Sequence, residues 1–408
     1  MNIIDVIDKK RLGKELSYKE LDYAFNGYLK KHIEDYQMSS LLMAVVIKGM
    51  TLNEVINLTD IFIKSGEIYD LSSVSDVIID KHSTGGVGDS TTLVVGPIVA
   101  ACGCHMAKIS GKGLGITGGT IDKLESIPGF NTKLTKKQFI NNLKTVGFVD
   151  SSQTKYLVPL DKIIYNLRNN SGTTESLGLI ASSIMSKKIA SGADIILIDI
   201  KVGKGALIKT KKDANTLSKW MKEIGKKYNK KVVTLITDMN IPLSNSIGNR
   251  LEVEEAINVL KGEKCRLYNI SKEISSILIS LSKGITIEEA NSLVDEVIRN
   301  KKAYNKFIEF CEAQGGDIKK MKISANQLII KSKKSGKLKS IDALKIGELS
   351  VRLGAGKIND KESIDYNAGI KIFKDIDDVV KKGDILAALY TNKKIKLNNE
   401  DINCFIIE

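Results

Sequence analysis

The sequence predicts an α/β protein with three parts: a small all-α domain, a large α/β domain with a mostly parallel central sheet, and a C-terminal α+β lobe. Three observations predict this. Apolar residues recur at helical spacing over the first 66 residues, short continuous aliphatic runs begin near Val74, and glycine-punctuated β-like segments follow Gly316. A chain of 408 residues also exceeds what one hydrophobic core usually supports.

Residues 1–68 are expected to be the first part of the helical domain. Ser17–Glu20 and Thr51–Glu54 fit the capping box, in which the first residue and a glutamate three positions later satisfy each other's backbone N–H groups. Apolar residues at spacings of three and four follow each box. Gly49 and Gly66 lie where helices should end.

Residues 69–160 and 193–335 are expected to form the α/β domain. The runs VSDVIID, HMAKIS, ADIILIDIKVG and KKVVTLITD are continuous aliphatic segments, which are typical of parallel strands covered on both faces. The run TTLVVGPIVAACG fits the same strand pattern, but its place after a glycine-rich turn makes Thr91–Cys102 a candidate helix. Residues 251–312 are again helical by pattern.

Residues 161–192 interrupt the strand pattern with about two helices and are expected to be the second part of the helical domain. Residues 336–408 combine short β-like pieces with glycine turns and are expected to form the C-terminal lobe. The connectors near 66–73, 154–162 and 190–194 would then be hinges between the helical and α/β parts.

Composition excludes several classes of protein. No run of roughly 18 apolar residues could span a bilayer, and the N-terminus lacks a signal peptide, so we expect a cytoplasmic protein. Five scattered cysteines and three dispersed histidines favour neither a disulfide framework nor a transition-metal site. The net charge of +14 is spread over the whole chain and few aromatic residues are present, so nucleic-acid binding is not expected as the main role.

The stretch KHSTGGVGDSTT, residues 81–92, has the features of a phosphate loop. Three glycines let consecutive backbone N–H groups converge on an anion, and the following helix would add its positive end. Lys81 would supply charge, and Ser83 and Thr92 hydroxyl donors. The alternative is a βα turn that binds nothing. The Walker A pattern is absent.

A second glycine cluster, KISGKGLGITGGTIDKLE, follows the strand HMAKI. Its glycines at 113, 115 and 118 match GxGxxG, but position 138, where a ribose-binding acid belongs, is glutamine. A dinucleotide site is therefore disfavoured. Two adjacent loops rich in Gly, Ser and Thr instead suggest two walls around one anion at the carboxyl edge of the sheet. Asp122 and Glu125 are expected to brace this loop.

KHSTGGVGDSTT followed by SGKGLGITGGTIDKLESIPGF resembles the signature of the pyrimidine-nucleoside phosphorylases, the thymidine phosphorylase family. The resemblance extends over nearly the whole chain, including LRNNSGTTES, SSIMSKK, DIKVGKGA and IPLSNSIGNRLEV. The positions that match the family's phosphate contacts are Lys81, Ser83, Thr92, Lys108, Ile109, Ser110 and Thr120. Those that match its pyrimidine contacts are His82, Arg168, Ser183 and Lys187.

The resemblance also implies ligands and partners. Inorganic phosphate would be the co-substrate, with no organic cofactor, and the chain would be a homodimer with neither nucleic-acid nor membrane partners. A K⁺ ion, where the family has one, would be held by the carbonyl groups of Gly88, Leu243 and Ser246, the Ser90 hydroxyl and the Glu255 carboxylate, an oxygen set suited to a hard cation. The chain departs from the family at Lys112, where arginine is typical, and at Ile116, where histidine is typical.

The reaction implied is reversible phosphorolysis of pyrimidine (deoxy)nucleosides such as thymidine and deoxyuridine. Because phosphate is itself the nucleophile, no activated serine or cysteine is needed. His82, Arg168 and Lys187 would be catalytic, taking up the negative charge that grows on the departing base. Ser183 and Lys187 share one helix face, which by itself is ordinary for surface residues. The residues do not decide whether uridine is also used.

Two other functions compete with this one. A phosphoribosyltransferase of the anthranilate type also has glycine-rich phosphate loops, but uses a diphosphate and magnesium, which call for acidic ligands. A basic nucleic-acid-binding protein would show affinity for RNA or DNA that depends steeply on salt.

Overall fold

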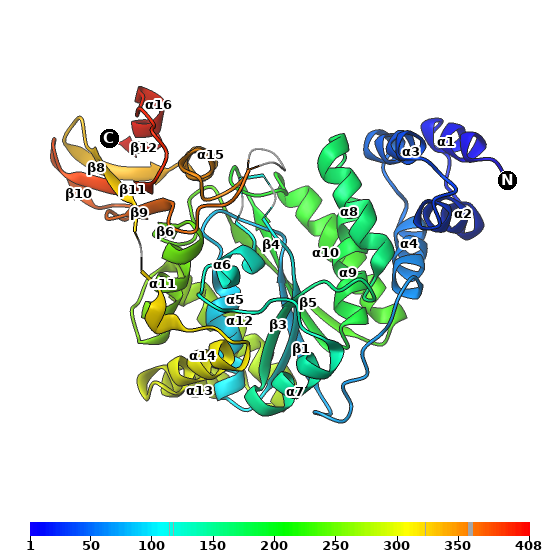
Figure 1. Ribbon diagram of the computed structural model, residues 1–408, viewed down its shortest axis with the longest axis horizontal. Helices are drawn as coiled ribbons and strands as arrows, with labels where there is room; N and C mark the ends of the chain where they lie inside the picture. Colours follow the sequence, from blue (N-terminus) through cyan, green and yellow to red (C-terminus); the bar gives the residue numbers. More distant parts are fainter. Residues whose placement is uncertain (114, 117, 323, 358–361) are drawn as a thin grey trace.

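The computed structural model describes residues 1–408 except 114, 117, 323 and 358–361 (Figure 1). Its elements confirm the predicted fold class: helices at the N-terminus, an α/β domain with a parallel sheet, and a C-terminal part with antiparallel sheets. In the part of the chain that it describes, no helix is both long and apolar enough to cross a membrane.

Two of the N-terminal helices begin at the capping boxes that the sequence predicted. Both capping boxes form, at Ser17 with Glu20 and at Thr51 with Glu54, and Gly49 ends the third helix with a positive φ of 72°. Residues 159–190 supply two further helices, and the second of these packs against the fourth N-terminal helix (Figure 1). These six helices are α1 (Ile3–Arg11), α2 (Tyr18–Leu29), α3 (Asp35–Lys48), α4 (Leu52–Lys64), α8 (Pro159–Ser171) and α9 (Leu177–Ala190).

The central sheet is parallel throughout, in the order β3-β2-β1-β4-β5. Its strands are β1 (Ile78–Ser83), β2 (His105–Ser110), β3 (Phe148–Ser152), β4 (Ile195–Val202) and β5 (Lys231–Asp238). The helices of this domain are α5 (Thr91–Ala101), α6 (Thr120–Glu125), α7 (Lys136–Val146), α10 (Lys211–Lys227), α11 (Asn249–Leu260), α12 (Arg266–Lys283), α13 (Ile287–Arg299) and α14 (Lys302–Ala313).

The run TTLVVGPIVAACG is the helix α5 rather than a strand. Residues Thr91 to Ala100 are all buried, with α12 and α14 packed on the helix, so its sequence shows no polar face from which a helical period could be read. A Cβ at Gly96 would lie 2.5 Å from the Phe148 ring, which shows how closely α5 approaches the sheet.

The C-terminal lobe contains two antiparallel sheets, in the orders β6-β9-β11-β7 and β10-β8-β12. The first takes in β6, which belongs to the loop before α11, so the lobe is hydrogen-bonded to the α/β domain. The elements are β6 (Ser246–Ile247), η1 (Ile318–Lys320), β7 (Asn326–Lys331), β8 (Gly336–Ile341), α15 (Ala343–Leu353), β9 (Gly369–Ile372), β10 (Val379–Val380), β11 (Ile385–Thr391), α16 (Asn399–Ile402) and β12 (Phe405–Ile407).

The three connectors expected as hinges lie against one another. The Glu67 N–H donates to the Tyr156 carbonyl at 2.8 Å, and the Tyr69 N–H donates to the Ala190 carbonyl at 2.8 Å. Gly192 approaches the same segment, since a Cβ there would lie 2.7 Å from the Tyr69 carbonyl oxygen. The three connectors between the helical part and the α/β domain therefore contact one another around Tyr69.

A buried ion pair ties α1 to α4. Both Glu54 oxygens accept from the Lys10 ammonium, at 2.7 and 2.8 Å, and they also accept the N–H groups of Leu16 and Thr51. The Glu54 side chain is 0% exposed and that of Lys10 is 3% exposed. Glu54 thus closes a loop, caps a helix and neutralises a buried cation at once.

Glu54→Gln should lower the free energy of unfolding by about 3–5 kcal/mol, because it leaves the Lys10 charge buried without its counterion. Denaturant unfolding followed by circular dichroism would measure this. Glu15→Gln, on the surface of the same domain, is the control and should change stability by less than about 0.5 kcal/mol. Equal effects of the two substitutions would contradict the assignment.

Candidate active site

The predicted phosphate residues gather at the carboxyl edge of the sheet. Lys81, His82 and Ser83 end β1, and the glycine turn leads from them into α5. A Cβ at Gly86 would lie 2.4 Å from the Met239 side chain, and one at Gly88, whose φ is +71°, would lie 3.1 Å from the Ser244 nitrogen. The positive φ therefore requires glycine at position 88, and Gly86 lets the turn pack closely on Met239.

Lys81 is a buried cation at the start of this turn. Its ammonium donates to the Thr91 hydroxyl and lies 3.9 Å from the Asp89 carboxylate. Burial lowers the pKa of Lys81, and the negative charges of Asp89 and Asp199 oppose that shift. Burial would raise the pKa of Asp89, but Lys81 and Lys201 hold it well below its usual value. The carboxylates of Asp89 and Asp199 thus partly offset the cost of burying the charge of Lys81.

Asp89 belongs to a ladder of alternating charges behind the turn. On β4, the Lys201 ammonium lies 2.6 Å from the Asp199 carboxylate, which also accepts the Thr237 hydroxyl of β5 at 2.6 Å. Both side chains of this β4 pair are 0% exposed. Attraction to Asp89 and Asp199 raises the pKa of Lys201 against the effect of burial. Sequence analysis missed these residues, since an acid and a lysine near a strand end are common.

The other predicted phosphate residues surround the same strand ends. The Ser83 hydroxyl accepts the Gly85 N–H at 3.2 Å, Thr92 lies in the first turn of α5, and Thr120 begins α6. Lys123 of α6 ties that helix to the glycine turn, because its ammonium donates to the Asp89 carbonyl at 2.6 Å. The Ser110 hydroxyl donates to Asp150 at 2.8 Å.

Lys108 and Ile109 of β2 are hydrogen-bonded to β1 and to α9. The Lys108 ammonium donates to the Lys81 carbonyl at 2.5 Å, and the Ile109 carbonyl accepts from the Lys188 ammonium at 3.1 Å. Lys188 also pairs with Asp80 at 2.8 Å, and both side chains are 0% exposed. This contact connects α9 directly to β1 and β2.

The predicted pyrimidine residues on α8 and α9 form one cluster. The Lys187 ammonium donates to Ser183 at 2.7 Å and to Asp161 at 2.6 Å, and it lies 5.8 Å from the centre of the Tyr165 ring. Arg168 is buried beside them and donates to three backbone carbonyl groups, those of Thr173, Thr174 and Leu179. The sequence singled out neither Asp161, which fixes Lys187, nor these carbonyl groups.

His82 joins the sheet to this cluster. Burial lowers its pKa well below the usual value, and the charges of Lys188, Lys108, Lys187 and Lys81 lower it further. His82 of β1 is therefore within electrostatic range of Lys187 of α9. The imidazole is neutral, so it can donate one hydrogen bond to a ligand but does not bring a positive charge.

Comparisons with known proteins match the chain along its length. Models of the glycosyl transferase family match residues 4–66 as the helical bundle domain and 75–304 as the a/b domain, and the pyrimidine nucleoside phosphorylase C-terminal domain matches 337–401. The pyrimidine-nucleoside phosphorylase of Bacillus subtilis (strain 168) is 44% identical over 402 residues, which cover 97% of this chain and 93% of that protein. The chain belongs to the pyrimidine-nucleoside phosphorylase family.

A second relative supports the same family assignment. The pyrimidine-nucleoside phosphorylase of Geobacillus stearothermophilus is 42% identical over 402 residues, with coverage of 97% of this chain and 93% of that protein. This family member is a pentosyltransferase. The anthranilate phosphoribosyltransferase of Thermus thermophilus has a TM-score of 0.61 with 14% identity, covering 76% of this chain and 99% of its own, so the two share a fold.

Lys112 and Ile116, the two positions expected to depart from the family pattern, both have contacts with other parts of the chain. Lys112 pairs with Glu125 at 2.9 Å, and Glu125 also accepts the Tyr366 hydroxyl at 3.3 Å. Ile116 packs against Gly347 of α15, where a Cβ on the glycine would lie 3.0 Å from the Ile116 Cβ. The brace expected from Asp122 is present, since its carboxylate accepts the Gly113 N–H at 2.6 Å. The second glycine loop is therefore attached to the C-terminal lobe.

The residues expected to hold K⁺ lie around the first glycine turn. The Gly88 carbonyl accepts from Ser244, the Ser90 hydroxyl donates to Glu252 at 2.8 Å, and Glu255 accepts the N–H groups of Asn245 and Ser246. Leu243 pairs with the same turn through its N–H group. Among the described residues, no side-chain cation pairs with the buried Glu255 carboxylate, whose pKa burial raises. A hard monovalent cation fits such an oxygen-rich set.

His82 should stay neutral throughout the range in which a free histidine titrates, about pH 5.5 to 7.5. In protein labelled with ¹⁵N-histidine, its ring signals should not move over this range, because protonation would add a cation among four lysines. His82→Asn assigns the signals, and the exposed His32 serves as the reference. A His82 signal that titrates with an ordinary midpoint would contradict the burial argument.

Proposed function

We propose that the protein catalyses the reversible phosphorolysis of pyrimidine (deoxy)nucleosides, such as thymidine and deoxyuridine, to the free base and a pentose 1-phosphate. The observation that carries this proposal is the meeting of two clusters at His82: a desolvated cation at a glycine turn, and the Lys187–Ser183 pair. Lys81 and the glycine turn are suited to bind an oxyanion. The Lys187–Ser183 pair is suited to bind a ring with carbonyl oxygens. A cytoplasmic role in nucleoside salvage fits this reaction.

On the phosphate side, the chain supplies charge, donors and position. Lys81 and the positive end of α5 attract the anion, and the hydroxyl groups of Ser83, Thr92 and Thr120 are its donors. Phosphate held there attacks C1′ of the pentose without needing a protein nucleophile. Its negative charge also stabilises the positive charge that grows on the sugar as the glycosidic bond lengthens.

On the base side, the chain supplies acceptors of negative charge. Lys187, held by Asp161, and Arg168 face the charge that develops on the pyrimidine oxygens as the bond to C1′ breaks. Ser183 can fix the imide edge of the ring through its hydroxyl group. Neutral His82 adds a hydrogen-bond donor between base and phosphate, so the base can leave as a stabilised anion.

The two substrates are assigned to different structural parts, which implies closure. Phosphate residues lie on β1, β2 and the helices that follow them, whereas Lys187 and Arg168 lie on α8 and α9. Movement about the bundled connectors near Tyr69 would bring the two together and exclude water. We also propose a homodimer through the N-terminal helices, where α1 and α3 expose Ile4, Met43 and Ile47.

The decisive assay is release of free base from thymidine, deoxyuridine and uridine with and without orthophosphate. Base release should require phosphate, and Lys81→Ala should lower kcat/KM by about 100-fold or more because an oxyanion contact is lost. Lys204→Ala, on an exposed turn of the same domain, is the control. No base release, together with steeply salt-dependent binding of RNA or DNA, would overturn the proposal in favour of a nucleic-acid-binding protein.

Replacing K⁺ by Na⁺ should weaken phosphate binding severalfold if a K⁺ ion neutralises Glu255 and fixes the glycine turn. The measurement is the KM for phosphate at constant ionic strength. Glu255→Gln should abolish the response to K⁺, whereas Glu254→Gln, the preceding residue on α11, should keep it. A response that survives in Glu255→Gln would place the ion elsewhere.

A further inference from the structure

One carboxyl group beside the phosphate site has no role in the reaction described so far. Asp150 lies in β3 as the register partner of Lys108 in β2, and its side chain is 0% exposed. One carboxyl oxygen accepts the Ser110 hydroxyl at 2.8 Å. The other is buried and has no hydrogen-bond partner among the described residues. Such a carboxyl group is costly to keep ionised.

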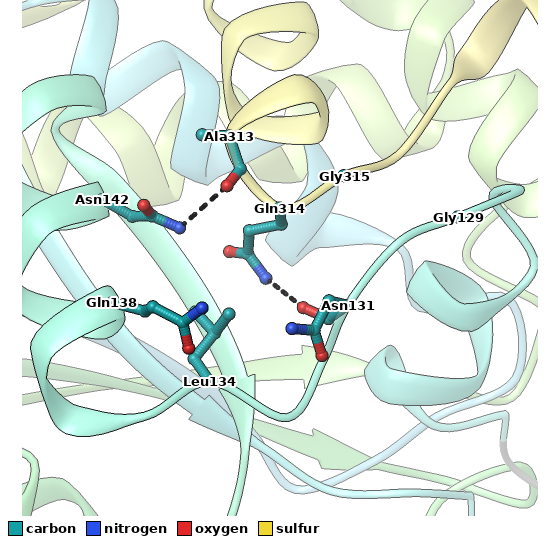
Figure 2. Close-up of a pocket in the computed structure, with 8 residues that line it drawn as sticks. All are labelled: Gly129, Asn131, Leu134, Gln138, Asn142, Ala313, Gln314 and Gly315. Carbon is teal, nitrogen blue, oxygen red and sulfur yellow. Dashed lines mark hydrogen bonds between the residues drawn. The ribbon is translucent and has the colours of Figure 1, made fainter.

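Asp150 is held in place through its backbone. The Gln314 side chain accepts the Asp150 N–H at 3.3 Å and donates to the Asp150 carbonyl at 3.0 Å. The same amide donates to the Asn131 carbonyl at 2.9 Å, at the pocket shown in Figure 2. The backbone of Asp150 is therefore fixed on both sides, and from this position its carboxyl group reaches Ser110.

The Ser110 hydroxyl has a single proton, and this creates a conflict. A serine that donates its proton to a carboxylate presents only lone pairs elsewhere. Ser110, one of the residues assigned to the phosphate, would then face a dianion with lone pairs and with a second negative charge directly behind them. Such an arrangement repels the ligand.

We propose that Asp150 binds phosphate-like anions in its neutral form, donating its proton to the Ser110 oxygen so that Ser110 donates its own proton to the anion. Asp150 is thus a positioning residue that acts through Ser110. Where Asp150 is ionised in the free protein, one proton is taken up from solvent when the anion binds and is released when it leaves; where Asp150 is already neutral, no proton is exchanged. The inference rests on the phosphate site of the proposed function.

The surroundings of Asp150 support a proton on it. Burial raises the pKa of this carboxyl group to about 7. Lys108 of β2 and Lys188 of α9 favour the ionised form, whereas Asp80 of β1 opposes it. A bound dianion adds further negative charge, so it also favours the neutral form. Anion affinity should therefore be greatest where the Asp150 carboxyl group is protonated and should fall as this group ionises. Burial also lowers the pKa of Lys108, whose loss of charge at higher pH acts in the same direction, so the substitution of Asp150 is what separates the two groups.

Sulfate is the appropriate probe, because its charge is constant over this range whereas phosphate itself titrates. Calorimetric titration in two buffers of different ionisation enthalpy should show uptake of up to one proton per sulfate bound. Above the pKa of Asp150, sulfate affinity should fall by up to about tenfold for each pH unit. Asp150→Asn should remove the proton uptake and flatten the pH profile. Asp295→Asn, on the surface of α13, should keep both.

Three outcomes would overturn the inference: undiminished proton uptake in Asp150→Asn, equal pH dependence of Ser110→Ala and the unchanged protein, or no binding of sulfate at any pH. Asp150→Leu serves if the asparagine variant does not fold, since an apolar side chain of similar size leaves no titrating group. Proton-linked sulfate binding without base release would contradict the proposed reaction but not the role of Asp150. Base release together with sulfate binding that takes up no proton would contradict the role of Asp150 but not the proposed reaction.

Discussion

The candidate active site depends on the pairing of buried lysines with nearby carboxylates. Lys81, Lys188 and Lys201 are almost fully buried at or near one edge of the sheet. Lys81 and Lys188 lie near carboxylates of a neighbouring turn and strand, and Lys201 lies near Asp199 of its own strand. A buried charge left alone would lose its proton or unfold its surroundings. Because each of these three lysines has a carboxylate nearby, it can keep its charge inside the protein.

The same constraint explains how the two substrate clusters are joined and yet distinct. Lys188 extends from α9 to Asp80 of β1, whereas its neighbour Lys187 turns toward Asp161 of α8. Lys188 thus anchors the helix to the sheet, whereas Lys187 is held within the helical part. Burial and the charges of both lysines lower the pKa of His82, which keeps its imidazole neutral.

The C-terminal lobe contributes to the site from a distance. Ile116 packs beneath α15, and Lys112 reaches Tyr366 through Glu125, so two positions that depart from the family pattern anchor the second glycine loop. The loop that carries Thr120 is thereby tied to a sheet formed largely by residues after 326.

The sequence by itself determined the fold class, the capping boxes and the glycine turn, because these depend on local periodicity, local hydrogen bonds and the absence of side chains. It also placed Lys81 and Ser183–Lys187 through long motifs. It left α5 open to interpretation as a strand, since a helix buried all round shows no polar face. Only the tertiary structure paired Asp161 with Lys187, Asp80 with Lys188 and Asp150 with Ser110. Those partners come from different strands and helices, and their electrostatic coupling depends on distances of a few ångströms that no spacing along the chain encodes.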